Sequence, residues 1–279
     1  MAAATAVLLL GGCIPAKLVA HALLHPDRIA PSPPPPLPHE DVDFESDGVH
    51  LRGWLFHAAA PRRGTVVFLH GASNNRSAAG PVIAHLVPRG WDVLAYDLRA
   101  HGLSGGDAST YGYWERRDLV RALEALDIQR AVVVGLSAGG AVALLAAARD
   151  DTRIAGVVAI GVFSDLASVA RERMPWWAAD RGLARGLALA EREGHFRVAD
   201  VSPVAAAPRV RVPVLLIHGE QDEWTSPDHS RRVYEALACE KRLIIVPGAH
   251  HTRELTPSVW PELEAWLDAR SAAAARPPS

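Results

Sequence analysis

A serine flanked by glycines joins an apolar run to a run of small residues, and this junction constrains the fold more than any other feature. The apolar run covers residues 131–134, the junction reads Gly-Leu-Ser-Ala-Gly around Ser137, and small or apolar residues continue to position 144. The first run indicates a buried strand and the second the start of a helix. Glycines two residues either side of Ser137 remove the Cβ atoms that would keep strand and helix apart. The pattern predicts a sharp strand-to-helix turn that presents the serine hydroxyl. Capping of the helix is the simpler alternative role.

A serine hydroxyl needs a neighbouring base and a third group that orients the base. Two later apolar runs, 212–217 and 243–246, end in loops that carry Asp222 and His251. Loops at the carboxyl ends of parallel strands are where open sheets form their sites. We therefore expect a catalytic set of Ser137, His251 as base and Asp222 as acid.

Two neighbouring residues remain alternatives. His250 precedes His251 in Gly-Ala-His-His and competes for the role of base. Asp165 follows the apolar run 154–160 and is an alternative acid, or the cap of a helix that begins near residue 166.

The order Ser, Asp, His on strand-end loops resembles the α/β-hydrolase superfamily, and other segments extend the resemblance over residues 42–267. Leu-His-Gly-Ala ending at Ala72 resembles the oxyanion loop, Asp-Leu-Arg-Ala-His-Gly-Leu-Ser at 97–104 resembles the DxRGHGxS segment, and His-Gly-Glu-Gln-Asp ending at Asp222 resembles the acid loop. The general likeness is to small serine esterases and acyl peptidases related to dienelactone hydrolases and prolyl oligopeptidases. Departures are Ala100 in place of the glycine of DxRGHG and His250 in place of the second glycine of GxGH.

The resemblance implies hydrolysis of carboxylic esters, thioesters or short peptide amides through an acyl-enzyme, with a small-molecule ester or acyl substrate. By register, the backbone amides of Ala72 and Ala138 would form the oxyanion hole. A non-catalytic ligand-binding protein of this fold and an acyltransferase remain alternatives.

Strand and helix patterns alternate along the chain, which predicts an α/β-hydrolase fold: a mostly parallel eight-stranded sheet with helices on both faces. The expected strands are 42–45, 49–56, 65–69, 92–96, 131–134, 154–160, 213–217 and 242–246, and the expected helices are 81–86, 115–126, 138–148, 228–237 and 259–270. The hydrolase domain would cover 42–279, with a small helical cap at about 162–210. Trp176 and Trp177 in this cap, and Trp224 after Asp222, are candidate pocket residues.

The first 25 residues are almost wholly apolar, interrupted by Lys17. Because the expected fold has no place for an apolar helix before its first strand, we expect residues 1–25 to be a membrane anchor or a signal-like segment. Leu-Gly-Gly-Cys ending at Cys13 resembles a lipobox. The Pro-rich segment 26–41 would be a stiff linker. The protein is then expected to be membrane-associated, and otherwise cytoplasmic.

Composition narrows the possible partners. The chain has 279 residues, 49% of them hydrophobic, and a net charge of -2. This length supports one large core, and the lack of a basic stripe with interleaved aromatics argues against nucleic acid as a partner. Two cysteines and 13 scattered histidines predict no disulfide framework, no metal site and no cofactor. The oligomeric state is left open.

Overall fold

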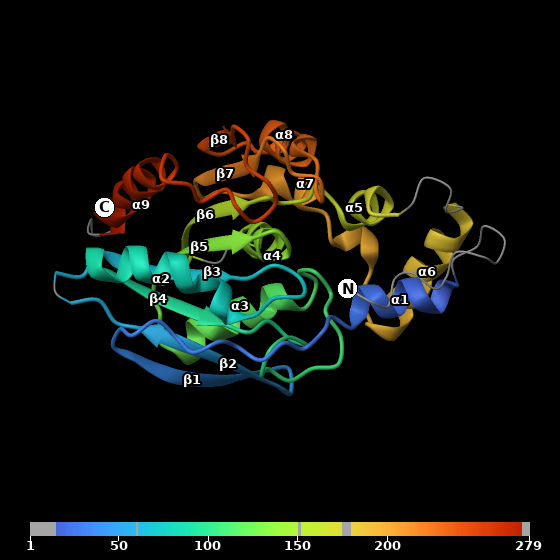
Figure 1. Cartoon of the computed structure of the whole chain (residues 1–279), viewed down its shortest axis with the longest axis horizontal. Helices are drawn as coiled ribbons and strands as arrows, with labels where there is room; N and C mark the ends of the chain where they lie inside the picture. Colours follow the sequence, from blue (N-terminus) through green and yellow to red (C-terminus); the bar gives the residue numbers. More distant parts are fainter. Residues whose placement is uncertain (1–14, 60, 150–151, 175–179, 275–279) are drawn as a thin grey trace.

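The computed structural model describes residues 15–59, 61–149, 152–174 and 180–274, and within them one eight-stranded sheet forms the body (Figure 1). The strands are β1 (His39–Ser46), β2 (Val49–Phe56), β3 (Gly64–Leu69), β4 (Trp91–Tyr96), β5 (Ala131–Leu136), β6 (Ile154–Ile160), β7 (Val214–Gly219) and β8 (Lys241–Val246). Their order is β1-β2-β4-β3-β5-β6-β7-β8. β2 pairs antiparallel with β1 and β4, and the other pairs are parallel. The predicted fold class is confirmed.

Helices cover both faces of the sheet because alternate residues of each buried strand point to opposite sides. In β3, Val67 and Leu69 pack with the helices α3 (Glu115–Ala125), α4 (Ala138–Ala147) and α8 (Pro227–Ala236). Val66 and Phe68 pack on the other face with α2 (Gly80–Leu86) and α9 (Trp260–Ala274). Strands β5, β6, β7 and β8 lie side by side and parallel in this sheet. The loops that follow β5, β7 and β8 therefore meet at one edge.

The alternation stops after β6, as expected, and the chain turns helical. The elements of this region are α5 (Leu166–Glu172), α6 (Asp180–Glu193) and α7 (Pro203–Ala206), with short 3₁₀ turns at Val198–Asp200 and Ala207–Arg209. Helix α6 lies at one end of the molecule, beside the first helix α1 (Ala16–Leu24) (Figure 1).

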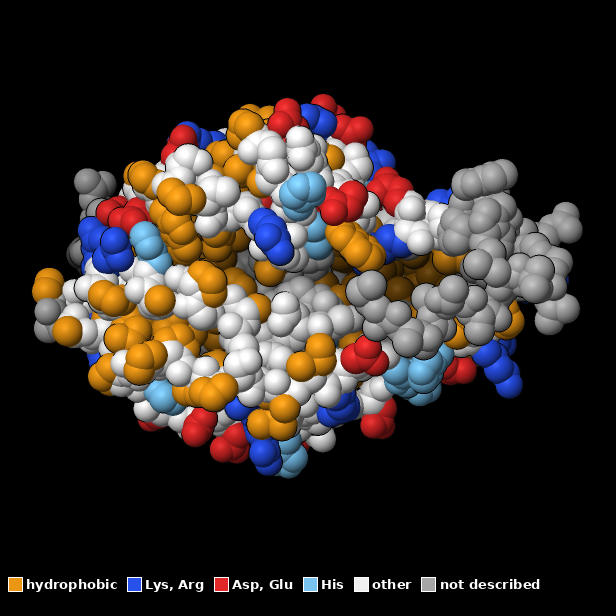
Figure 2. Space-filling view, in the orientation of Figure 1, with side chains coloured by type: hydrophobic (Ala, Val, Ile, Leu, Met, Phe, Trp, Pro, Cys, Tyr) orange, Lys and Arg blue, Asp and Glu red, His pale blue; other side chains and the backbone are white. Residues whose placement is uncertain are grey.

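Helix α1 corrects the expectation that the fold has no place for an early apolar helix. Ala20 and Leu24 have no exposed surface and belong to the main hydrophobic cluster. Gly186 of α6 permits the close approach, since a Cβ at that position would lie 2.4 Å from the Cβ of Val19. The apolar residues after Lys17 therefore bury one face of a helix against the cap. Figure 2 shows hydrophobic side chains recessed between the body and this end of the molecule.

The rest of the expected anchor, including Cys13 and its lipobox-like sequence, lies in residues 1–14, outside the described residues. In the described ranges, no helix is both long enough and apolar enough to cross a bilayer.

The Pro-rich segment is held on the body at several points. The carbonyl oxygen of Ile29 accepts a bond from Asn75 Nδ2 at 3.0 Å, and that of Ser32 accepts one from Ser77 Oγ at 3.2 Å. Arg28 Nη1 donates to the carbonyl of Ser104 at 2.7 Å. The expected linker 26–41 is thus docked along its first half, and its last residues form the start of β1.

Candidate active site

The predicted turn between β5 and α4 is present, and Ser137 stands at its apex. Its backbone has φ 53° and ψ -113°, a conformation that non-glycine residues rarely adopt. A Cβ at Gly139 would lie 2.2 Å from the carbonyl oxygen of Leu69, and one at Gly135 would lie 2.2 Å from that of Gly139, so both positions require glycine. Ser137 occupies the N-cap position of α4, but its side chain makes no capping hydrogen bond.

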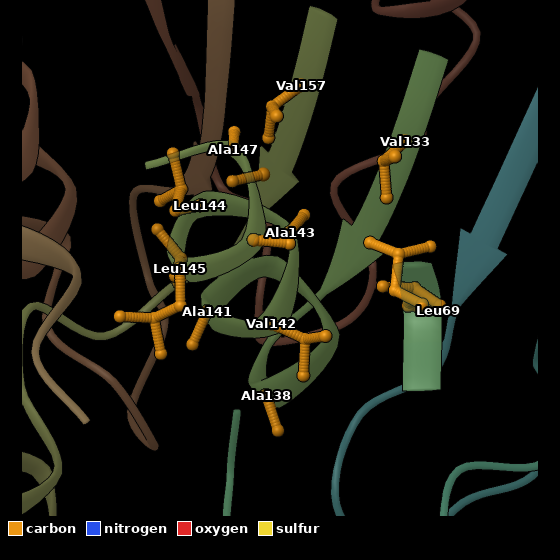
Figure 3. Close-up of a cluster of buried hydrophobic side chains, with 14 of the residues drawn as sticks. Leu69, Val133, Ala138, Ala141, Val142, Ala143, Leu144, Leu145, Ala147 and Val157 are labelled. Atoms are coloured by element: carbon orange, nitrogen blue, oxygen red, sulfur yellow. The ribbon is translucent and has the colours of Figure 1, made fainter. Parts of the chain in front are cut away.

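Small side chains let α4 sit directly on the strands behind this turn. Ala138, Ala141 and Val142 follow the turn, and the helix packs near Leu69 and Val133 (Figure 3). All the residues of α4 are buried, so the helix supports Ser137 from inside the core.

The structure brings Ser137, His251 and Asp222 together. His251 Nε2 lies 3.2 Å from Ser137 Oγ, and His251 Nδ1 lies 2.6 Å from Asp222 Oδ2. Because a carboxylate only accepts hydrogen bonds, Nδ1 carries the proton and Nε2 is free to accept the serine proton. This is the tautomer that a general base requires.

Asp222 is held in its charged form by several donors. Its Oδ1 accepts the backbone N–H groups of Trp224 and Thr225, each at 2.9 Å, and its Oδ2 lies 3.2 Å from Nε2 of the buried His218. Burial acts to raise the pKa of Asp222, but hydrogen bonds from His218 and His251 outweigh it and hold the pKa well below its usual value.

His218 was not singled out by the sequence analysis. Its Nδ1 lies 2.6 Å from Ser230 Oγ, and its Nε2 lies 2.9 Å from the carbonyl oxygen of Thr225. The carbonyl can only accept, so Nε2 carries the proton and also faces Asp222. The sequence offers one indication that His218 contacts the acid: it stands four residues before Asp222 in His-Gly-Glu-Gln-Asp.

The two alternative residues make other contacts. His250 is on the surface, where its Nδ1 lies 2.9 Å from Glu223 Oε2. Asp165 caps helix α5 by accepting the backbone N–H of Ser168 at 2.8 Å. The geometry therefore favours His251 over His250 and Asp222 over Asp165.

The two expected oxyanion donors lie beside Ser137 and are free. Ala72 lines the cavity in front of the serine, and Ala138 is the first residue of α4. In the part of the chain that the structure describes, neither backbone amide donates a hydrogen bond.

The loop that carries Ala72 is fixed by the buried His70. Its Nε2 accepts the backbone N–H of Leu98 at 2.9 Å, so its Nδ1 donates to the carbonyl of Gly71 at 2.8 Å. Burial, together with His101 alongside, lowers the pKa of His70 to about 3, which keeps the ring neutral. His70 thus positions the oxyanion loop through backbone bonds.

A cavity of about 450 Å³ opens in front of Ser137. Its lining residues are Ala22, Gly71, Ala72, Ser73, Asn74, Tyr111, Leu136, Ser137, Arg173, Trp224, His251 and Thr252. Trp224 therefore lies at the cavity, as expected of a pocket residue, and it is 60% exposed. Trp176 and Trp177 lie outside the described residues.

A second buried carboxyl stands behind His251. Glu254 has no exposed surface, neither of its carboxyl oxygens has a hydrogen-bond partner, and burial raises its pKa. Gly161 leaves room for it, because a Cβ there would lie 2.8 Å from Glu254 Oε1 and 3.3 Å from His251 Cε1. Asp222, His251 and Glu254 offer ligand atoms within 4.8 Å of one another, a set that could hold a metal ion. An ion there would have to displace the hydrogen bond between Asp222 and His251.

Replacement of Glu254 by glutamine is expected to stabilise the protein increasingly as the pH rises from 4 to 8. A carboxyl whose pKa is raised in the folded state favours folding only while it is protonated, and this contribution is lost as the pH rises through the folded pKa. Glutamine stays neutral throughout. Thermal unfolding at pH 4, 6 and 8 measures the difference in unfolding midpoint between variant and wild type. Glu193→Gln, at an exposed carboxyl of α6, is the control. A difference independent of pH would contradict the expectation.

Comparisons with known proteins identify the family and the fold. A family model described as alpha/beta hydrolase fold matches residues 64–200, and one described as serine aminopeptidase, S33, matches residues 199–254. The uncharacterized protein YfhR of Escherichia coli (strain K12) is 31% identical over 229 residues, which cover 78% of this chain and 75% of YfhR.

Solved structures share the same architecture. The esterase Pf2001 of Pyrococcus furiosus superimposes with a TM-score of 0.68 at 24% identity, over 89% of this chain and 97% of Pf2001. The proline iminopeptidase of Mycobacterium smegmatis gives a TM-score of 0.65 at 20% identity, over 84% of this chain and 100% of that protein. At these identities the likeness is one of fold.

Proposed function

Because this chain belongs to the α/β-hydrolase superfamily and is a hydrolase, we propose that it cleaves carboxylic esters through an acyl-enzyme formed on Ser137. The observation that carries the proposal is the line of hydrogen bonds from Ser137 Oγ through His251 to Asp222, at 3.2 and 2.6 Å. It lies at the edge of a cavity large enough for a small-molecule ester.

In the proposed reaction, His251 Nε2 takes the proton of Ser137 as the oxygen attacks the ester carbonyl. The charge on the carbonyl oxygen is stabilised by the amides of Ala72 and Ala138. Ionised Asp222 stabilises the imidazolium that forms on His251. His251 then protonates the leaving alcohol, and water, activated by the same nitrogen, cleaves the acyl-enzyme to a carboxylic acid.

The charge of the cavity favours esters over the amides of aminoacyl substrates. An aminopeptidase must bind a free ammonium group, for which a carboxylate is the natural partner. Among the described residues that line the cavity there is no aspartate or glutamate, and the one permanently charged side chain is the cation Arg173. Thioesters and transfer of the acyl group to an acceptor other than water use the same residues.

The test is labelling of the full chain by a fluorophosphonate probe, followed by turnover of p-nitrophenyl esters and aminoacyl p-nitroanilides. We expect one label per chain on Ser137, ester turnover, and at least about 100-fold lower kcat/KM for the anilides. A folded protein that takes no label would be a non-catalytic member of the family. A preference for aminoacyl anilides would make it a peptidase.

A further inference from the structure

A second cavity, of about 190 Å³, adjoins the cavity in front of Ser137. The two cavities share three lining residues, Ala22, Tyr111 and Arg173, so they meet at these side chains. The other residues that line the second cavity are Val19, Leu23, Leu166, Val169, Ala170, Met174, Leu183 and Leu187. All of these are aliphatic or thioether side chains. They come from α1, from α5 and Met174 just after it, and from α6.

The junction between the cavities is held in a fixed conformation. Tyr111 has φ 55°, in the left-handed region that non-glycine residues avoid. The buried carboxylate of Glu115 fixes this loop, because it accepts the backbone N–H and the hydroxyl of Thr110, each at 2.7 Å, and the N–H of Gly112 at 2.8 Å. Strained residues held by their surroundings are typical of ligand sites.

The charged group at the junction points away from the apolar cavity. Arg173 Nε lies 3.3 Å from the carbonyl oxygen of Trp224, and Arg173 Nη2 lies 3.3 Å from Thr225 Oγ1. Its guanidinium thus bonds the loop that carries Asp222, while its aliphatic stem remains for the cavity walls.

We propose that this apolar cavity binds the acyl chain of the ester and makes the enzyme selective for medium-chain acyl groups. The inference rests on the proposed function. A chain attached to the carbonyl at Ser137 would pass between Ala22 and Tyr111 and end among α1, α5 and α6. A cavity of about 150 Å³ takes up one benzene molecule, so this one has room for roughly six to eight carbons of an aliphatic chain.

Helix α1 thereby acquires a role in the reaction. Val19, Ala22 and Leu23 of this helix line the proposed chain site, together with Val169 and Leu187. Three of the apolar side chains of α1 would thus contact the substrate.

The test is the dependence of kcat/KM on acyl length, from p-nitrophenyl acetate to decanoate below their micelle concentrations. Each methylene that enters an apolar site favours binding by about fourfold, so the four additional methylenes of octanoate should raise kcat/KM over that of butanoate by up to about 250-fold, with a fall at decanoate. In Ala170→Trp, the indole fills the cavity, and the octanoate advantage should shrink to about threefold or less while acetate turnover stays within about twofold. Ala167→Trp, at an exposed position of the same helix, should match wild type.

A flat acyl-length profile in wild type overturns the inference, as does an equal loss of acetate and octanoate turnover in Ala170→Trp. The inference is also overturned if kcat/KM depends on chain length only in n-alkyl acetates, where the alcohol chain varies, because the alcohol would then occupy the cavity. Rates of labelling by fluorophosphonates with ethyl and octyl chains distinguish failure of the chain site from failure of the proposed function. Labelling at equal rates overturns the chain site alone, whereas no labelling overturns the proposed function and the chain site together.

Discussion

Replacement of Ser137 by alanine is expected to lower kcat for p-nitrophenyl esters by at least about 10,000-fold, with no loss of fold. The variant lacks the oxygen that lies 3.2 Å from His251 Nε2 and would bond to the acyl group. Loss of the nucleophile from a serine triad costs this much or more, because the remaining groups only polarise the substrate. Turnover and fluorophosphonate labelling measure the effect, and circular dichroism and thermal unfolding measure the fold.

Ser137→Gly provides a matched variant that separates catalysis from backbone strain. Both variants lack the hydroxyl, but only glycine accepts φ 53° without a steric cost. Relief of the strain is worth about 1–3 kcal/mol, part of which the greater freedom of glycine in the unfolded chain offsets. We expect the glycine variant to unfold at least about 2 °C above the alanine variant.

Three results would contradict this account. Ester turnover above about 1% of wild type in Ser137→Ala would mean that another group attacks the ester. Retained fluorophosphonate labelling would place the nucleophile elsewhere. A glycine variant that unfolds below the alanine variant would show that the turn is not strained.

The sheet and the turn that carries Ser137 could be predicted because their sequence patterns are local. Continuous apolar runs such as 131–134 indicate strands buried on both faces, and Gly135 is required because a Cβ there would lie 2.2 Å from the carbonyl oxygen of Gly139, within the turn itself. The convergence of Asp222 and His251 also followed, since loops after neighbouring parallel strands meet at one edge. The choice between His251 and His250 needed the structure, because only there is it visible that the ring of His251 reaches Ser137 while that of His250 contacts Glu223.

Whether the N-terminal helix packs on the protein or enters a membrane could not be predicted, because the sequence of an apolar helix face is the same whether lipid or protein covers it. What decided it for residues 16–24 is a distant glycine, Gly186, which lets α6 approach Val19. The role of Glu254 was hidden for a similar reason. Three residues after His251 it looks like any loop carboxyl, and only the fold shows that it is buried without a hydrogen-bond partner.

Replacement of Asp222 by asparagine is expected to lower kcat by about 1,000- to 10,000-fold. The amide cannot stabilise a positive charge on His251, and its NH₂ group can donate to His251 Nδ1 and so favour the wrong tautomer. The steady-state rate of p-nitrophenyl ester hydrolysis measures the loss. Asp165→Asn is the matched control, since that carboxyl caps α5 and should leave kcat within about twofold of wild type.

The same pair of variants tests the ionisation of Asp222. A carboxyl whose pKa is depressed by folding stabilises the protein above its unfolded pKa of about 3.9, and this contribution is lost as the pH falls toward the folded pKa. The unfolding midpoint of wild type should therefore exceed that of Asp222→Asn at pH 7, and the gap should narrow as the pH falls below about 4. A constant gap would mean that Asp222 is not held ionised by His218 and His251. Full activity in Asp222→Asn together with loss in Asp165→Asn would assign the acid to the end of β6 instead.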